Sequence, residues 1–590
     1  IQRYYAPSLQ FLFSTGNGAP GYGTTAPPSP GMGIAVGAST EYGSTGWDTI
    51  TTTNQINFND YTAFSNGGPS ARAGSGVDVL ASGSYSAGAE KLNYYAASMW
   101  GVLDGNISWS TWGGTSRSAP TAMGNLALIY QAYKAKHGVW PTAEQARALL
   151  MSSATDINNG VLKQGAGSVN ADQGTAVAAG LYGVYMAGDS ASWEPGNYRG
   201  TLYPGFAQVV YPEDVLTKTF TIHNDSPYTY TVAISDKALA LVDSVELDFT
   251  VTPTMTQQEG VYGAANRDNF YKAFQYMIPI TATAGMDSSM HNVDIPVGTD
   301  LMVVRQIFPY DEFDVGENYT YDNRFYLMVY NWKDVDGDGK VWDDMNGNGV
   351  VNFINGTEWT SVDVGPELAW SDPRTELDRW EFERYGYNRP TANTNELTVQ
   401  DPLNRMHDGM FIGLRHLYTG TGAAVTVHLK YRIEFYSKAD VAWLSTPASL
   451  VVPANGTAAL DATITVPNDM PAGDYEAAIE IDTPTVLDYP AHTTVIPVTM
   501  NVAAKFEGDA ITLGGADAYA YSADKPYNTA AVRGYQDWGW REESGDWRMF
   551  YVDVESPADA GAHVIVKNEW SGAAPHNDND TVILGPTATE

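Results

Sequence analysis

The sequence predicts an α/β region up to about residue 183, followed by several all-β sandwich or jelly-roll domains. In the first part, the main signal is a helical segment with small residues at its start, Ser118–Lys136. Beyond residue 185 the pattern changes to short alternating segments such as Leu216–His223, which precedes the turn-forming run Asn224–Pro227. Alternation closed by Asn, Asp, Ser and Pro is typical of strands in β-sandwiches.

The segment Ser118–Lys136 predicts a buried helix that ends near Gly138. Thr142 with Gln145 predicts a capping box for a second helix that continues through Ser152. The larger apolar residues that we expect the first helix to bury are Met123, Leu126, Leu128, Ile129 and Tyr133.

The run Gly114–Pro120, with sequence GTSRSAP, is the strongest chemical signal in the chain, and Ser116 is its candidate nucleophile. A serine hydroxyl attacks a peptide carbonyl only when a neighbouring base takes its proton and fixed donors stabilise the oxyanion. The start of a helix helps, because its unpaired amides present partial positive charge to a developing anion. The alternative is a serine that only caps the helix.

Gly114–Pro120 and its helix resemble the serine box of the subtilisin-like serine proteases. Phe13–Gly18 (FSTGNG) resembles the strand of that family that ends in AGN, and Gly31–Ser39 (GMGIAVGAS) resembles the strand with VGA that follows it. By this resemblance, Asn17 is the oxyanion-hole amide. A turn asparagine beside glycine is the simpler alternative for Asn17.

Three more segments resemble motifs of the same family. Phe64–Pro69 is similar to its FSxxGP turn, and Gly76–Gly83 to its PDxxAPG segment, with Asp78 in the aspartate position and Ser82 in place of the usual proline. Gly165–Ala171 is similar to the motif that closes the catalytic domain. The resemblance spans about 170 residues in family order and implies the C-terminal half of a parallel-sheet catalytic domain over residues 1–183.

The catalytic His and Asp of the family lie ahead of its AGN strand, so the resemblance predicts that an N-terminal segment of the same protease supplies both. That segment is a predicted partner. The chain has nine histidines, none in a context resembling the His-Gly-Thr turn of the family, and we expect surface or hydrogen-bonded imidazoles. They are His137, His223, His291, His407, His416, His428, His492, His563 and His576.

Composition predicts a secreted, multidomain protein. The 590 residues exceed one core, and a hydrophobic content of 43% is typical of globular chains. The net charge of -36 argues against nucleic acid and anionic membranes as partners, because both would be repelled. No apolar run reaches the length that spans a membrane. The chain has no cysteine, so its partners are non-covalent and its stability comes from large cores and bound calcium.

The β region divides into a large sandwich over 184–437, an immunoglobulin-like domain over 438–503, and a jelly-roll-like domain over 504–590. Within the first lies a run of hard oxygen donors around tight glycine turns, which predicts tandem structural calcium loops. Met345 stands where an EF-hand has glutamate, and a solvated acidic turn is the alternative. The candidate metal ligands are Asp334, Asp336, Asp338, Asp344, Asn346 and Asn348.

These features together predict an extracellular serine endopeptidase that hydrolyses protein or peptide substrates through an acyl-enzyme on Ser116. The alternative is a surface or assembly scaffold that keeps a protease fold without catalysis. A third interpretation, carbohydrate binding by exposed aromatics such as Trp538 and Trp540, competes with burial of the same residues in a core.

Overall fold

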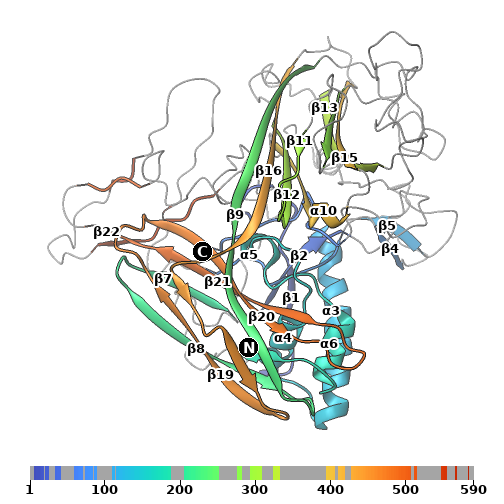
Figure 1. The fold of residues 1–590 in the computed structure, drawn as a ribbon, viewed down its shortest axis with the longest axis vertical. Coiled ribbons are helices and arrows are strands. Elements are labelled where there is room, and N and C mark those ends of the chain that lie inside the picture. The colour runs from blue at the N-terminus through green and yellow to red at the C-terminus, as the bar shows by residue number, and fades with distance from the viewer. Residues whose placement is uncertain are drawn as a thin grey trace.

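A computed structural model describes an α/β region followed by β-sheets (Figure 1). The described residues are 5–18, 20–25, 33–40, 59–70, 74–83, 86–89, 109–112, 114–187, 205–251, 276–281, 293–307, 323–332, 394–405, 409–418, 427–506, 510–513, 547–554, 565–567 and 583.

A three-stranded parallel sheet forms the centre of the α/β region. Its strands are β1 (Leu12–Ser14), β2 (Ile34–Ser39) and β3 (Val79–Ser82), in the order β1-β2-β3. All six residues of β2 are buried, as expected for the middle strand of a covered parallel sheet. The predicted parallel sheet is therefore confirmed for this part of the chain.

The helices with defined bounds in the described part of this region are α3 (Thr115–His137), α4 (Ala143–Ser152), α5 (Val161–Gln164) and α6 (Ala171–Ala178). The apolar face of α3 joins residues of β2, β3, α4 and α6 in one buried core. In Figure 1, α3 stands beside the sheet with α4 and α6 next to it. The predicted capping box at the start of α4 is present, with Thr142 and Gln145 bonded reciprocally.

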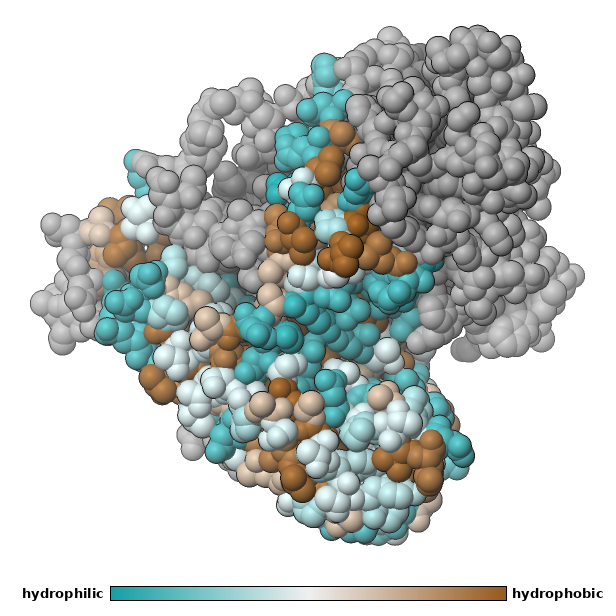
Figure 2. Space-filling model, viewed as in Figure 1, coloured by the Kyte–Doolittle hydropathy of each residue, from teal (hydrophilic) through white to brown (hydrophobic). Residues whose placement is uncertain are grey.

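One expectation for α3 is wrong. Leu126, Ile129 and Tyr133 are buried, but Met123 is 56% exposed and Leu128 47% exposed. A helix presents only one stripe to a core, and these two residues lie outside that stripe. On the described surface in Figure 2, hydrophobic residues lie in small groups among hydrophilic ones.

Two short strands lie just before α3 along the chain. β4 (Ser86–Ala89) and β5 (Trp109–Trp112) pair antiparallel as a separate two-stranded sheet. They bring residue 112 next to the run that begins at Gly114.

The largest sheet runs in the order β14-β12-β16-β9-β20-β21-β7, and β18 also pairs with β9. Its strands are β7 (Phe206–Val210), β9 (Tyr230–Val251), β12 (Leu301–Ile307), β14 (Thr394–Gln400), β16 (Val427–Asp440), β18 (Ser449–Val452), β20 (Gly473–Thr483) and β21 (His492–Val502). β9 is the longest and pairs with β20 near its start and with β16 along the rest.

A second sheet packs on part of the first through a common core that contains Phe220, Val232, Leu460 and Ile479. Its order is β17-β19-β8-β6, with strands β6 (Tyr185–Ala187), β8 (Val215–Asn224), β17 (Leu444–Ser445) and β19 (Gly456–Thr465). Strands from both sides of the predicted boundary at 437/438 therefore share sheets and a core. The division of the β region into domains stays a prediction.

The remaining described strands form two smaller sheets. One has the order β11-β10-β15-β13, and the other pairs β22 with β23 in parallel. The strands are β10 (Tyr276–Thr281), β11 (Val293–Asp294), β13 (Asn323–Trp332), β15 (Gly409–Tyr418), β22 (Ala504–Phe506) and β23 (Val552–Val554), and a short helix, α10 (Pro402–Arg405), follows β14.

Buried polar contacts join the α/β region to the large sheet. Asp60 accepts hydrogen bonds from the Thr398 hydroxyl at 2.7 Å and from the Gln400 backbone N–H at 2.6 Å, both in β14. Burial raises the pKa of Asp60 from 3.8 to about 6, although Arg405 and these hydrogen bonds oppose the rise. The contact between the two regions thus contains a carboxyl group whose pKa is raised by burial.

Asp60 is expected to make the stability of the protein fall as pH rises from about 4 to about 6. In this window the folded state keeps a proton on Asp60 that the unfolded state releases, so folding is favoured at the acidic end by up to about 3 kcal/mol. In thermal melts, the melting temperature of Asp60→Asn relative to that of the wild type should be lower at about pH 4.5 than at about pH 7. Asp440→Asn, at a carboxylate that is 89% exposed, is the matched control. A difference between wild type and Asp60→Asn that does not change with pH would contradict the expectation.

Candidate active site

Ser116 is the second residue of α3, and its side chain is exposed. The helix begins after Gly114, whose φ of 132° suits glycine and which provides no side-chain cap. In the described part of the chain, the backbone N–H of Ser116 has no acceptor, as expected in the first turn of a helix. Ser116 therefore presents a hydroxyl and an N–H donor at the positive end of a 23-residue helix.

The side chain of Asn17 caps this helix from the loop after β1. Its Oδ1 accepts hydrogen bonds from the backbone N–H and from the hydroxyl of Thr115, both at 2.9 Å. Because Oδ1 is occupied in this way, the Nδ2 end of the amide is the one that can donate. A Cβ atom on Gly114 would lie 3.4 Å from that Nδ2, so the amide stands directly beside the residue that precedes the helix.

Thr115 is a site residue that the sequence interpretation missed. Its hydroxyl donates to Asn17 Oδ1 and accepts from the Gly16 N–H at 3.1 Å, so it joins the start of α3 to the end of β1. The only signal for it was its place beside Ser116 in the GTS motif. The structure thus brings the two predicted residues, Asn17 and Ser116, to adjacent positions through Thr115.

Close packing behind Ser116 depends on Gly83, the residue after β3. Gly83 donates to Ser39 at 2.9 Å and accepts from the Gly114 N–H at 2.7 Å. A Cβ atom at position 83 would stand 2.0 Å from the Ser118 hydroxyl and 2.8 Å from Ala38 Cβ. Glycine at this position therefore lets the first turn of α3 lie against the ends of β2 and β3.

Asp78 is buried and holds the sheet together. Its Oδ1 pairs with Arg147 of α4 at 2.7 Å, and its Oδ2 accepts from the Ala35 N–H in β2 at 2.7 Å. Such a pair stabilises only because both charges are hydrogen-bonded. In this structure Asp78 contacts other residues of the sheet and α4.

Three of the described histidines have partners away from Ser116. His137 pairs with Asp225 at 3.3 Å, His223 stacks on Tyr185, and Nε2 of His492 lies 3.0 Å from the Ser152 carbonyl. Burial lowers the pKa of His492, although its bond to Ser152 opposes this. None of these three histidines forms a hydrogen bond or ion pair with Ser116 in the described part of the chain.

The predicted calcium ligands, Asp334 to Asn348, lie outside the described residues, as do Trp538 and Trp540. Where the structure is described, no three His, Cys, Asp or Glu residues are grouped so that they could hold a metal ion. None of the described helices combines the length and apolar character that crossing a membrane requires.

Thr115→Val is expected to loosen the joint between β1 and α3. The substitution leaves the Gly16 N–H without its acceptor, which costs about 1–3 kcal/mol in the free energy of local opening. Hydrogen exchange of the segment around Gly16 measures this opening. Thr115→Ser keeps the hydroxyl and is the control, so equal exchange rates in the two variants would show that the hydroxyl does not hold the joint.

Comparison with solved structures gives several proteases at low identity. A lanthipeptide protease is 20% identical over 29% of this chain and 52% of its own, with a TM-score of 0.22. The patellamide maturation protease PatA is 20% identical over 30% of this chain and 53% of its own, with a TM-score of 0.21. Tripeptidyl peptidase 2 is 11% identical over 80% of this chain and 34% of its own, with a TM-score of 0.23.

The chain thus spans about half the length of the first two of these proteins. Such identities and TM-scores are too low to transfer any property from those proteins. No curated protein matches the chain. The profile of the Subtilase family, Peptidase_S8, matches residues 3–174, which include β1, β2, β3 and the whole of α3. Residues 3–174 of this chain therefore form a region that matches the Subtilase family.

Proposed function

We propose that this chain is the part of an extracellular serine endopeptidase that carries the nucleophile, Ser116, and the oxyanion donor, Asn17. The observation that supports this best is the pair of hydrogen bonds from Thr115 to Asn17 Oδ1, which turn the amide so that Nδ2 can donate beside the start of α3. The match of residues 3–174 to the subtilase family agrees with this assignment.

In the proposed reaction, the Ser116 hydroxyl attacks the carbonyl carbon of the scissile peptide bond. A base takes the hydroxyl proton, and negative charge develops on the carbonyl oxygen. The N–H of Ser116 and Nδ2 of Asn17 are the two donors for that oxygen. When the tetrahedral intermediate collapses, the amine leaves with a proton, and water then hydrolyses the acyl-enzyme.

The base and the aspartate that orients it are proposed to come from an N-terminal segment of the same protease. His137, His223 and His492 support this, because each has a partner other than Ser116. With no cysteine in the chain, that segment would be held by packing and hydrogen bonds.

Structural calcium is proposed at the acidic loops, where carboxylate and amide oxygens alternate with glycines. The proposed ligands are Asp334, Asp336, Asp338, Asp344, Asn346 and Asn348.

A fluorophosphonate probe, which forms a covalent adduct with an activated serine, tests the proposal. We expect the natively purified protein to take up one adduct on Ser116, located by peptide mass spectrometry, and to co-purify with a polypeptide carrying the family's Asp and His motifs. Ser116→Ala should abolish the adduct. Ser118→Ala, in the same motif and with a buried hydroxyl that has no partner in the described residues, should keep it.

Asn17→Asp separates catalysis from stability. Aspartate keeps the acceptor for Thr115 at a helix N-terminus, where negative charge is favourable, so the protein should stay folded. The rate of labelling should fall by about 10²–10³-fold, a magnitude known for loss of one such donor in a subtilisin. If the polypeptide with the Asp and His motifs is present and Ser116 takes up no adduct, the proposal fails and the non-catalytic scaffold is favoured.

A further inference from the structure

The loop that follows Asn17 is held at several points by other parts of the protein. Within the α/β region, the Gly23 N–H donates to Gly68 at 2.7 Å and the Thr24 N–H donates to Gly67 at 2.9 Å. The Asn66 amide donates to the Thr15 carbonyl at 2.9 Å. These bonds fix Gly23 and Thr24 at the far end of the loop and Thr15 ahead of Asn17, while Pro20 to Tyr22 lie between them.

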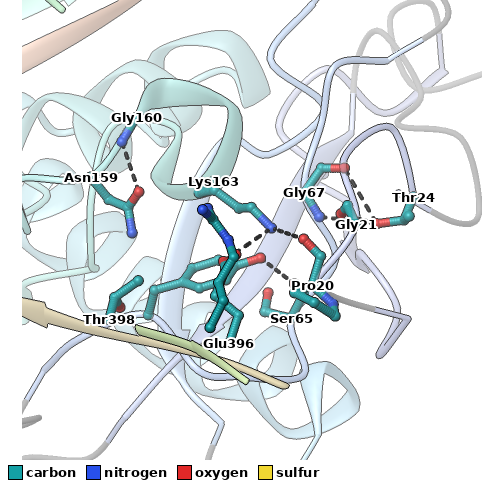
Figure 3. A network of polar contacts seen from close by, with 12 residues as sticks. Pro20, Gly21, Thr24, Ser65, Gly67, Asn159, Gly160, Lys163, Glu396 and Thr398 are labelled. Carbon is teal, nitrogen blue, oxygen red and sulfur yellow. Dashed lines mark hydrogen bonds and ion pairs between the residues drawn. The ribbon is translucent and has the colours of Figure 1, made fainter. Parts of the chain in front are cut away.

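Lys163 of α5 fixes this middle part. Its Nζ donates to the Pro20 carbonyl at 2.6 Å and lies 4.3 Å from the centre of the Tyr22 ring. Only 2% of the lysine is exposed. In Figure 3, Lys163 reaches from its helix towards Pro20 on one side and Glu396 on the other. A Cβ atom on Gly67 would stand 2.8 Å from Lys163 Cδ, so glycine there leaves space for the lysine stem.

Glu396, in β14 of the large sheet, is the anionic partner of this lysine. Its Oε1 lies 4.0 Å from Lys163 Nζ, and its Oε2 accepts from Arg305 Nε of β12 at 2.7 Å. Arg305 also pairs with Glu434 of β16. Two buried cations and two buried anions therefore form one group, which the part-exposed Arg432 joins through an ion pair with Glu434, and three adjacent strands of the large sheet hold its position.

A second contact from far along the sequence meets the same loop. The Trp547 N–H donates to the Tyr22 carbonyl at 2.9 Å. A Cβ atom on Gly23 would stand 2.6 Å from Trp547 Cβ, so the two backbones are packed closely. Trp547 is linked to the large sheet, because the Asn501 amide in β21 donates to the Met549 carbonyl at 2.9 Å.

We propose that Lys163, oriented by Glu396, is a positioning residue for Asn17, through which the large β-sheet sets the geometry of the loop beside the nucleophile. Lys163 acts on the loop backbone three residues after Asn17. The ion pair with Glu396 fixes where the ammonium stands, and the ammonium in turn fixes the Pro20 carbonyl. The catalytic part of this inference rests on the proposed peptidase function; the link between β14 and the loop does not.

The test measures two properties of the intact protein, together with any polypeptide that co-purifies. Hydrogen exchange of peptides covering residues 15–25 reports the order of the loop. The second-order rate of fluorophosphonate labelling at Ser116 reports the geometry of the site. For Lys163→Met we expect faster exchange in residues 20–24 and labelling slower by up to about 10²-fold, since small displacements near reacting groups have effects of this size. Glu396→Gln should shift both properties in the same direction, by less.

Lys438→Met is the matched control. Lys438 is another lysine that links the two regions, with ion pairs to Asp156 of the α/β region and to Glu480 of β20, neither of them in residues 17–25. The Lys438→Met variant should be less stable than the wild type. Its exchange rates in residues 20–24 and its labelling rate should equal those of the wild type. If Lys163→Met does not fold, the double variant Lys163→Met/Glu396→Gln takes its place in both measurements. The double variant removes one positive and one negative charge.

The outcomes separate this inference from the proposed function. Unchanged exchange in residues 20–24 of the lysine variant, or an equal change in Lys438→Met, overturns the linkage. Faster exchange with an unchanged labelling rate overturns the positioning role. If the wild type takes up no probe, the peptidase proposal and the positioning role both fail, and exchange alone decides whether β14 holds the loop.

Discussion

The candidate site depends on the contact between Thr115 and Asn17, which links α3 to the loop after β1. The proposed nucleophile lies on α3 and the proposed oxyanion donor on the loop after β1, and these two segments are far apart in the sequence. The Thr115 hydroxyl is bonded to Gly16 and Asn17 together, so α3 and β1 cannot move independently without breaking both bonds. Gly83 adds a steric condition, because only glycine lets α3 approach the ends of β2 and β3 this closely.

The buried charges at the edge of the large sheet call for a different explanation from the apolar cores. Removing an ion from water costs several kcal/mol, and apolar residues of similar size in its place are often neutral or stabilising. Arg305, Glu396 and Glu434 are therefore weak evidence for added stability. Their directional bonds do define one relative placement of β12, β14 and β16, and the ammonium of Lys163 fits only that placement. We interpret the cluster as fixing position at some cost in stability.

Local patterns in the sequence predicted local structure well. The capping box at Thr142, the strand β8 and the helix α3 all follow from short-range rules, because each depends on residues within a few positions of one another. The burial of Met123 was predicted wrongly, since an apolar residue in a helix does not reveal which side faces the core. The family resemblance placed Asn17 and Ser116, but it gave no role to Thr115.

Contacts between distant segments could not be predicted in this way. Nothing near Lys163 in the sequence indicates that Glu396 will lie beside it, because the packing of α5 against β14 joins segments far apart in the chain. The same limit hid the sharing of sheets across 437/438, a boundary that β16 itself crosses. A boundary drawn from composition marks a change in pattern, whereas hydrogen bonding between strands ignores order along the chain.

Continuity of the large sheet explains why a β region could matter to a site that it does not contain. β9 pairs with β20 beside the apolar core and then runs on to pair with β16 (Figure 1). β16 pairs with β12, and β12 pairs with β14, the strand that carries Glu396. Each step is a ladder of backbone hydrogen bonds, so the carboxylate is held by the same sheet that packs against the core. A loop that is fixed by such a sheet needs less order of its own, because the entropy of ordering it is offset by contacts made elsewhere.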